Sequence, residues 1–224
     1  MERNQNFIFT ALSISTDSGF LYHGEVKTQV RLIRHKPLLA KAIETCTSLS
    51  QFTDILKEHP NDFQLPPVAL IGPKEATDVQ RTLARQFGSK MAHLGLTVIC
   101  GGRTGAMEAV CQGVHDAGGR SIGLLPGDRW QEANPYVTIP VVTNMGPTRN
   151  SLIAKTAFVL VAIGGGYGTL TEMAYGLHYG KPVIGMLDAP CVQGALRCTD
   201  LDTVSKHILT TLMGEVNQSF NNTQ

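Results

Sequence analysis

Two glycine-rich runs carry the residues of this sequence that are best suited to chemistry. Each run follows a short apolar stretch and precedes a stretch with helical periodicity. Glycine lets backbone N–H groups approach a bound group, and the first turn of a helix adds partial positive charge. Strand-to-helix turns also use glycine for geometry alone, but two such runs, each with a threonine hydroxyl, favour a phosphate site. The candidate residues are Gly101, Gly102, Arg103, Thr104 and Gly105 in the first run, and Gly164, Gly165, Gly166, Tyr167, Gly168 and Thr169 in the second.

Both runs differ from the best-known nucleotide motifs. No Gly-Lys-Ser/Thr follows either run, so neither is a Walker A loop. The first run lacks Gly-x-Gly-x-x-Gly spacing, and no ribose-binding acid stands out after a second strand. The sequence therefore disfavours ATP hydrolysis and hydride transfer, and it favours binding of a small phosphorylated molecule.

Glu172, four residues beyond Gly168, has two interpretations. Thr169 and Glu172 fit a capping box, in which each side chain bonds to the other residue's backbone N–H at a helix start. Beside a bound phosphosugar, the same carboxylate would instead stabilise positive charge on the ribose or orient a water molecule. The sequence leaves both interpretations open.

Further candidates follow the other apolar stretches. Arg149 opens a predicted helix, where its charge opposes the helix dipole, so a phosphate or substrate contact is favoured over a surface ion pair. Asn150 is either a ligand contact or a solvent-facing helical residue. Tyr167 is placed to stack on a base or a pterin ring. Gly72 and Met145 complete the expected binding residues.

An alternation of apolar runs and helical stretches must position these residues. Short Val- and Ile-rich runs are typical of strands buried on both faces, and strands separated by helices pair in parallel. The sequence therefore predicts a doubly wound, mostly parallel α/β sheet, with ligands beyond the carboxyl ends of its strands. The predicted strands are 68–71, 97–100, 121–125, 137–142, 158–163 and 183–187, and the predicted helices are 76–93, 106–117, 148–156, 169–179 and 201–212.

Glycine is scarce in the first part of the chain, which places a domain boundary after residue 65. Residues 1–65 are expected to hold two strands, 7–15 and 20–33, and one helix over 38–58. This segment shows no catalytic signal and is too small to bury much surface alone. Residues 66–224 form the predicted Rossmann-like, phosphate-binding domain.

Composition narrows the range of partners. The 224 residues carry a formal net charge of +1 without a run of Lys or Arg, so we expect no nucleic acid or membrane partner. The apolar runs are shorter than the about 20 residues of a membrane helix, so we expect a cytoplasmic protein. The five cysteines form no CxxC pair, and Cys111 and His115 have no third ligand nearby, so no metal site is expected.

The second glycine run carries a family resemblance. Residues 164–172 resemble the proline-glycine-glycine-x-glycine-threonine-x-x-glutamate motif of the Lonely Guy family. Residues 101–107 resemble that family's earlier glycine loop, and the resemblance spans about residues 67–187. It implies a Rossmann-like enzyme that releases the free base from a nucleoside 5'-monophosphate. Carried over by position, the family's catalytic glutamate and arginine correspond to Glu172 and Arg149.

Two departures from that pattern point to a sister branch. Gly164 stands where the motif has proline, and Asn150 stands where a lysine usually follows the arginine. The Arg-Asn pair, residues 101–110 and residues 134–136 look closer to the molybdenum cofactor carrier proteins, which bind a phosphorylated pterin cofactor intact. The resemblance also implies a homodimer or higher homo-oligomer. We therefore expect a carrier of a nucleotide or a molybdopterin-type cofactor, with a nucleotide phosphoribohydrolase as the alternative.

Overall fold

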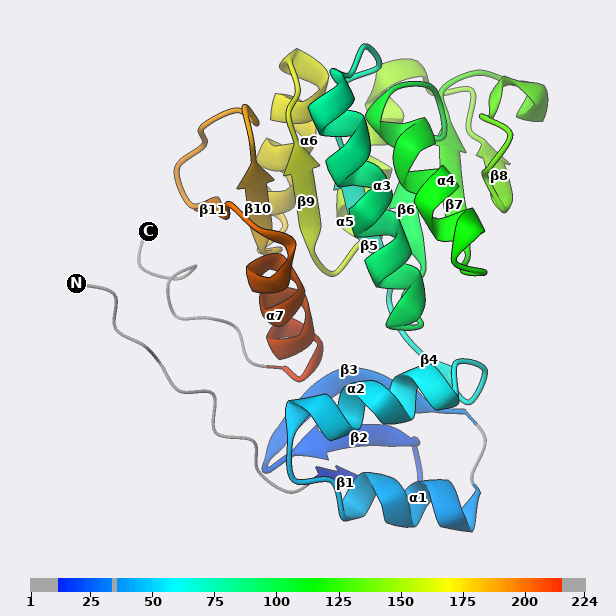
Figure 1. Ribbon diagram of the computed structural model, residues 1–224, viewed down its shortest axis with the longest axis vertical. Helices are drawn as coiled ribbons and strands as arrows, with labels where there is room; N and C mark the ends of the chain where they lie inside the picture. Colours follow the sequence, from blue (N-terminus) through cyan, green and yellow to red (C-terminus); the bar gives the residue numbers. More distant parts are fainter. Residues whose placement is uncertain (1–11, 34–35, 215–224) are drawn as a thin grey trace. The chain divides into compact units, whose positions relative to one another are not determined.

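The computed structural model describes residues 12–33 and 36–214, which form two units. Residues 66–205 form the larger unit (Figure 1). Residues 12–33, 36–65 and 206–214 form the smaller one. The sequence-based division placed 206–214 in the larger domain, whereas in the structure these residues group with the smaller unit, where Gly214 lies against the backbone of Lys27. The predictions made for residues 1–11 and 215–224 lie outside the described residues.

The larger unit is built on a parallel sheet with the strand order β11-β10-β9-β5-β6-β7-β8, counted over the described residues. All six pairings between neighbouring strands are parallel. The doubly wound fold predicted from the sequence is therefore confirmed. The strands are β5 (Val68–Ile71), β6 (Val98–Cys100), β7 (Ser121–Leu125), β8 (Ile139–Val142), β9 (Leu160–Ile163), β10 (Val183–Met186) and β11 (Leu196–Arg197).

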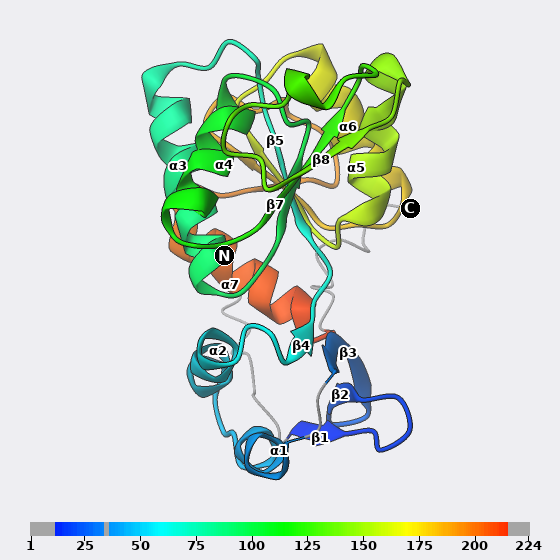
Figure 2. The same cartoon turned by 90° about the vertical axis from the view of Figure 1, so that its right-hand side faces the viewer.

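Helices cover both faces of this sheet. Helices α3 (Asp78–His93) and α4 (Ala106–Asp116) lie on one face, and α5 (Asn150–Thr156) and α6 (Tyr167–His178) lie on the other (Figure 2). Burial on both faces explains why every residue of β5, β9 and β10 is buried. Within the described residues, no helix is long and apolar enough to cross a membrane.

The two edge strands differ from the sequence-based expectation. Ile139, Val141 and Val142 of β8 are exposed, so the prediction that this run is buried on both faces is wrong. The strand ends the sheet, and among the described residues no further strand pairs with its outer edge. The opposite edge strand, β11, was not predicted, because two residues carry no periodic signal.

The strand order fixes where a ligand pocket can form. From β5 the chain adds β6, β7 and β8 on one side, and it then returns to place β9 on the other side of β5. The loops after β5 and β9 therefore leave the sheet toward opposite faces and open a crevice at its carboxyl edge. The second glycine run lies directly after β9.

The smaller unit is an antiparallel sheet with two helices on the same side (Figure 2). Its strands are β1 (Leu12–Ile14), β2 (Phe20–His23), β3 (Val26–Leu32) and β4 (Phe63–Gln64), and its helices are α1 (Pro37–Glu44) and α2 (Leu49–Glu58). The prediction of one strand over 20–33 is wrong, because a tight turn at Gly24, with φ of 61°, separates β2 from β3.

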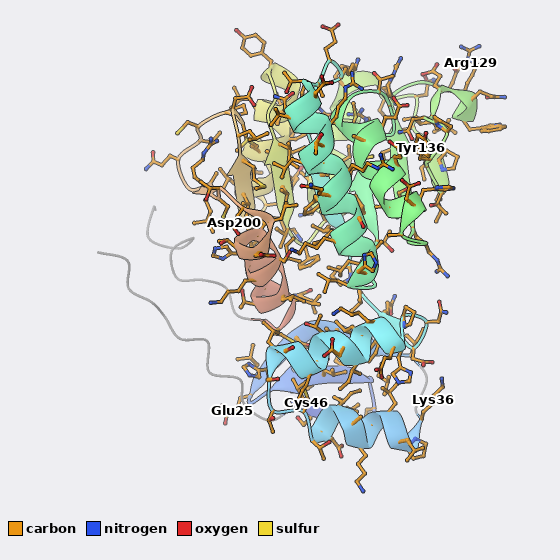
Figure 3. The ribbon with its side chains drawn as sticks, viewed as in Figure 1. Glu25, Lys36, Cys46, Arg129, Tyr136 and Asp200 are labelled. Carbon is orange, nitrogen blue, oxygen red and sulfur yellow. The ribbon has the colours of Figure 1, made fainter. Side chains whose placement is uncertain are left out.

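The prediction of one helix over 38–58 is also wrong. The chain leaves the helical conformation at Thr45, and Cys46 lies buried in the turn between α1 and α2 (Figure 3). The Ser48 side chain then accepts a hydrogen bond from the Gln51 N–H at 3.2 Å and caps α2. The Thr-Cys-Thr-Ser stretch favours this break, because Ser and Thr hydroxyls compete with helical backbone bonds.

A first prediction concerns the contact between α3 and α4. A Cβ on Gly113 would collide with the Arg85 carbonyl, and a Cβ on Gly88 would collide with the Val110 carbonyl. Gly113→Ala should therefore lower the free energy of unfolding by about 1–3 kcal/mol, measured by urea denaturation. Gln86→Ala, at an exposed position of α3, should change it by less than about 0.5 kcal/mol. Equal effects of the two substitutions would contradict this account.

Candidate functional site

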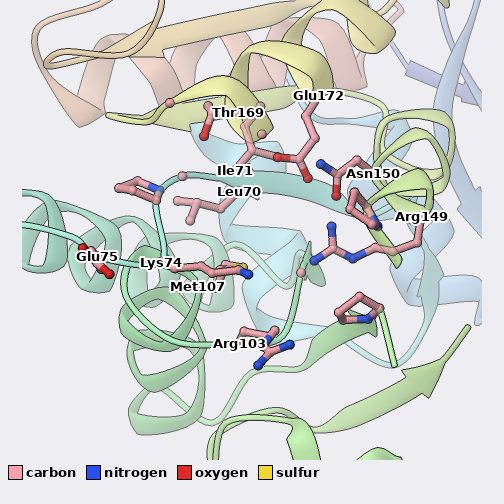
Figure 4. Close-up of a pocket in the computed structure, with 17 residues that line it drawn as sticks. Leu70, Ile71, Lys74, Glu75, Arg103, Met107, Arg149, Asn150, Thr169 and Glu172 are labelled. Atoms are coloured by element: carbon pink, nitrogen blue, oxygen red, sulfur yellow. The ribbon is translucent and has the colours of Figure 1, made fainter. Parts of the chain in front are cut away.

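A pocket of about 730 Å³ opens at the carboxyl edge of the parallel sheet (Figure 4). The segments that follow β5, β6, β7, β8 and β9 all contribute to its lining. Its position is the one at which doubly wound sheets bind ligands. The predicted binding residues that line it are Gly72, Gly101, Arg103, Arg149, Asn150, Gly166, Gly168, Thr169 and Glu172.

The second glycine run opens α6 toward this pocket. The helix begins after Gly166, and no side chain caps its first N–H groups. Thr169 is 3% exposed, and its hydroxyl has no hydrogen-bond partner among the described residues. Gly165 has a φ of 135°, and a Cβ there would collide with the Thr169 side chain. The glycine thus lets a buried hydroxyl and free N–H groups lie at one wall of the pocket, as anion binding requires.

The first glycine run is closed by protein groups instead. The Ala106 N–H, at the start of α4, donates to the Pro73 carbonyl at 3.0 Å. Thr104 is exposed, and its hydroxyl contacts the Lys74 carbonyl at 3.4 Å. A Cβ on Gly105 would collide with the same two carbonyls. In the first run the Thr104 hydroxyl is therefore directed to a protein carbonyl, and the prediction that this run contacts a phosphate stays a prediction.

Only two residues of the first run line the pocket, Gly101 and Arg103. Gly102 has a φ of 69° and packs against Gly123 of β7, which leaves no room for a Cβ. Arg103 forms an ion pair with Glu132 at 3.6 Å. The first run therefore supplies close packing and one side chain, whereas the second run supplies the open helix start.

Arg149 is a buried cation in the pocket wall. It ends the 3-10 helix η2 (Gly146–Arg149) and is only 7% exposed. Its Nε donates to the Leu124 carbonyl at 2.8 Å, and no carboxylate of the described residues lies within 4.0 Å of it. Burial lowers the pKa of Arg149, and the nearby Glu172 partly opposes that shift. The alternative of a surface ion pair is therefore wrong.

Gly101 makes room for this guanidinium. A Cβ built on Gly101 would lie 2.5 Å from Nη2 of Arg149 and 2.7 Å from Sδ of Met107. Both distances are too short for any side chain to be added without displacing one of the two groups. The glycine is required here by the approach of the arginine and not by its backbone angles.

Glu172 faces the pocket from α6 and has no partner among the described residues. The capping-box interpretation is wrong, because α6 begins at Tyr167 and Thr169 is already inside its first turn. Burial raises the pKa of Glu172 to about 8, and the charge of Arg149 offsets this only in part. At pH 7 the empty pocket therefore holds mainly the neutral carboxylic acid.

Asn150 completes the polar wall. Its side chain is 7% exposed, so the solvent-facing alternative is wrong, and its Oδ1 is buried without a hydrogen-bond partner among the described residues. Figure 4 shows Asn150 between Glu172 and Arg149, with the guanidinium pointing toward the centre of the pocket. Buried polar groups without partners are rare in native proteins and are concentrated at functional sites.

Several predicted binding residues lie outside the pocket lining. They are Gly102, Thr104, Gly105, Met145, Gly164, Gly165 and Tyr167. Tyr167 is 89% exposed and Met145 is 42% exposed. Gly164 has a φ of 64°, and a Cβ there would collide with Gln80, whose Nε2 donates to Asp188 Oδ1 at 2.8 Å. Because proline requires a φ near −65°, this backbone explains why the motif's proline is absent.

Sequence reasoning placed Gly72, in the loop after β5, at the ligand edge but did not single out the residues that follow it as binding residues. Pro73, Lys74 and Glu75 line the pocket beside the predicted Gly72. Their position after a buried strand was a usable signal, but they carry no motif. The apolar part of the lining, also missed, comes from Leu70, Ile71, Met107, Pro126 and Pro147. Across residues 12–33 and 36–214, no group of three or more His, Cys, Asp or Glu side chains could hold a metal ion.

Comparisons with known proteins agree with this architecture. Residues 66–215 match the SLOG cluster4 family. The molybdenum cofactor carrier protein of Chlamydomonas reinhardtii is 28% identical with a TM-score of 0.62, over 68% of this chain and 100% of that one. The molybdenum cofactor binding protein of the phototrophic bacterium Rippkaea orientalis is 33% identical with a TM-score of 0.54, over 67% of this chain and 86% of that one.

A curated enzyme is also similar in sequence. Cytokinin riboside 5'-monophosphate phosphoribohydrolase LOG5 of Arabidopsis thaliana is 30% identical over 117 residues. The match covers 51% of this chain and 49% of the plant enzyme, so the chain spans about half the length of that relative.

The raised pKa of Glu172 leads to a second prediction. A carboxyl whose pKa is raised by folding destabilises the folded protein as the pH rises from its ordinary pKa near 4.5 to about 8. Between pH 5 and 8, wild type should lose stability relative to Glu172→Gln by up to about 1.4 kcal/mol per pH unit. Urea denaturation of both proteins at several pH values measures this difference. Parallel stability curves would show that Glu172 titrates normally.

Proposed function

The chain belongs to the SLOG cluster4 family, and on that basis we propose that its larger unit binds a phosphorylated, ring-containing small molecule and carries it intact. The ligand is a nucleotide or a molybdopterin-type cofactor. The observation that carries the proposal is that an uncapped helix start, the buried Thr169 and the buried polar side chains of Arg149, Asn150 and Glu172 line one pocket. Among the described residues the Oδ1 of Asn150 is buried without a hydrogen-bond partner. Two of the similar solved structures are of proteins named for carrying or binding the molybdenum cofactor.

In this proposal the phosphate binds at the start of α6. The free N–H groups around Gly166 and Gly168 donate to its oxygens, and the Thr169 hydroxyl adds a second kind of donor. Neither glycine has another atom within 4 Å of its Cβ position, so an anion can approach the backbone closely. The partial positive charge of the helix start stabilises the bound anion further.

The ring of the ligand packs on the apolar part of the lining. Leu70, Ile71 and Met107 supply this surface, and a volume of about 730 Å³ falls within the range of small-molecule and cofactor pockets. A molybdopterin-type cofactor fits the donor set, because its phosphate matches α6. The described lining includes no Cys or His, so a metal on the ligand would keep its own ligands and the protein would hold the organic part.

Hydrolysis of a nucleoside 5'-monophosphate is the second candidate function. It is favoured by the proximity of Arg149 and Glu172 in one wall and by the similarity to LOG5. A hydrolase of this kind needs negative charge near the ribose as positive charge develops there. Burial raises the pKa of Glu172 to about 8, so at pH 7 its carboxyl is mainly protonated and would serve this reaction as a proton donor to the leaving base. Intact binding is favoured because two of the similar solved structures are of proteins named for carrying or binding the molybdenum cofactor.

We also propose a homodimer formed through α5 and α6. None of the exposed positions of α6 is Asp, Glu, Lys or Arg, and its only such residue, Glu172, is buried. Tyr167, Leu170 and Tyr175 are exposed on α6, and Leu152 is exposed on the neighbouring α5. A surface helix that lacks charged residues is typical of a helix buried in an assembly. The cytoplasmic location remains a prediction from the sequence.

The third prediction tests the phosphate site. Thr169→Val should weaken binding of adenosine 5'-monophosphate about tenfold, measured by isothermal titration calorimetry, because it removes a hydrogen bond to a charged group. Thr104→Val, in the other glycine run, should leave the affinity unchanged, since Thr104 lies outside the pocket. If both variants lose affinity equally, both glycine runs contact the phosphate, as the sequence predicted.

An assay of the wild-type protein with nucleoside monophosphates distinguishes binding from hydrolysis. Wild type incubated with AMP, GMP, CMP or UMP should release neither free base nor ribose 5-phosphate, assayed by chromatography. Release of base that Glu172→Ala abolishes would overturn the carrier proposal in favour of the hydrolase.

The fourth prediction concerns assembly. Leu170→Lys combined with Tyr175→Lys should convert a dimer into a monomer in light scattering, because two charges would be buried in the α6 surface. Val141→Lys, at the exposed edge strand β8, should leave the dimer intact. A monomer from Val141→Lys and a dimer from the double variant would place the interface at β8 instead.

A further inference from the structure

From the buried guanidinium of Arg149 we propose that the pocket contains a second anion subsite, distinct from the start of α6. The ligand would then carry two anionic groups, a phosphate at α6 and a second phosphate or other oxyanion at Arg149. This inference rests on the proposed function and narrows the class of ligand.

The first argument is the cost of burying a charge. Arg149 is 93% buried, as its 7% exposure implies, and a cation removed from water is costly unless it is paired. A guanidinium has five N–H donors, and only the Nε donor has an acceptor among the described residues, the Leu124 carbonyl. The donors on Nη1 and Nη2 remain unused. A bound anion would satisfy them, and the planar fork suits two oxygens of one group.

The second argument is that the structure keeps this guanidinium in the pocket. The Nε bond to Leu124 fixes the side chain at its base, and the missing side chain at Gly101 leaves space beside Nη2. Without the glycine the guanidinium would have to move. The hydrogen bond to Leu124 and the space at Gly101 together keep the guanidinium directed toward the centre of the pocket, as Figure 4 shows.

The third argument is the charge balance of the lining. Its charged residues are Lys74, Glu75, Arg103, Arg149 and Glu172. Arg103 lies 3.6 Å from Glu132, which also lies 3.8 Å from Arg129. Glu172 is mainly protonated at pH 7, because burial raises its pKa to about 8. Among the three cations of the lining, Arg149 is the buried one, whereas Lys74 is exposed and Arg103 is half-buried.

The fourth argument is that the two proposed anion positions, at Thr169 and at Arg149, lie apart in the pocket. In Figure 4, Thr169 and Arg149 lie at opposite ends of the polar wall, with Glu172 and Asn150 between them. A pocket of about 730 Å³ is far larger than a single phosphate requires. One phosphate at the start of α6 would therefore leave Arg149 unpaired, and a ligand with a second anion on the far side of its ring would satisfy both.

The test compares ligands that share a base and differ in charge. Adenosine 5'-monophosphate has one phosphate, and adenosine 2',5'- and 3',5'-bisphosphate have a second one on the other side of the ribose. In calorimetry at pH 7 and matched ionic strength, wild type should bind at least one bisphosphate about tenfold or more tightly than the monophosphate. In Arg149→Met this ratio should fall to about one.

Arg129→Met provides the matched control. Arg129 is 72% exposed on its side chain and lies at the surface (Figure 3), outside the pocket lining. The substitution removes the same formal charge, so it should preserve the tenfold ratio if the effect is local. Should Arg149→Met fail to fold by circular dichroism, Arg149→Lys keeps the charge without the fork and should reduce the ratio about threefold.

The outcomes separate the two proposals. A wild type that binds the monophosphate but prefers neither bisphosphate overturns the second subsite alone. A preference that survives in both Arg149 variants, or is lost equally in Arg129→Met, also overturns it. A wild type that binds none of the three ligands overturns the phosphate site at α6, and the second subsite with it.

Discussion

The free-energy cost of burying polar side chains without hydrogen-bond partners is the main constraint on the wall of the pocket. Thr169, Asn150, Glu172 and Arg149 are all at least nine-tenths buried, and each leaves hydrogen-bonding capacity unused within the described residues. A sequence selected for stability alone would replace them with apolar residues or give them partners. Their presence in one wall is the basis of the proposed ligand site, and the raised pKa of Glu172 is a direct consequence of the same burial.

The fold makes this wall possible through its strand order and its glycines. The crevice between the loops after β5 and β9 collects residues from five strands. The two glycine runs have different structural roles. The first run packs closely against the loop after β5, and its Gly101 leaves room for the guanidinium of Arg149. The second run leaves the first N–H groups of α6 without a side-chain cap. Two loops that are similar in sequence therefore differ in structure, since the first is closely packed and the second leaves a helix start without a side-chain cap.

The sequence predicted the parallel fold and the strand ends where the pocket lies, because buried runs and helical stretches alternate clearly after residue 65. It could not separate the roles of Thr104 and Thr169, since the closing carbonyls at Pro73 and Lys74 come from a segment 30 residues away. It left Arg149, Asn150 and Glu172 ambiguous, because burial depends on tertiary packing. The break at Thr45 and the short strand β11 were missed, because local propensity there is weak.

The backbone of Gly164 limits how this chain could evolve. Its φ of 64° and its close contact with the Gln80 side chain mean that a single codon change to proline would strain the loop that precedes α6. The same contact means that even alanine at this position would have to displace the Gln80 side chain, so both the backbone angle and the neighbouring side chain restrict residue 164 to glycine.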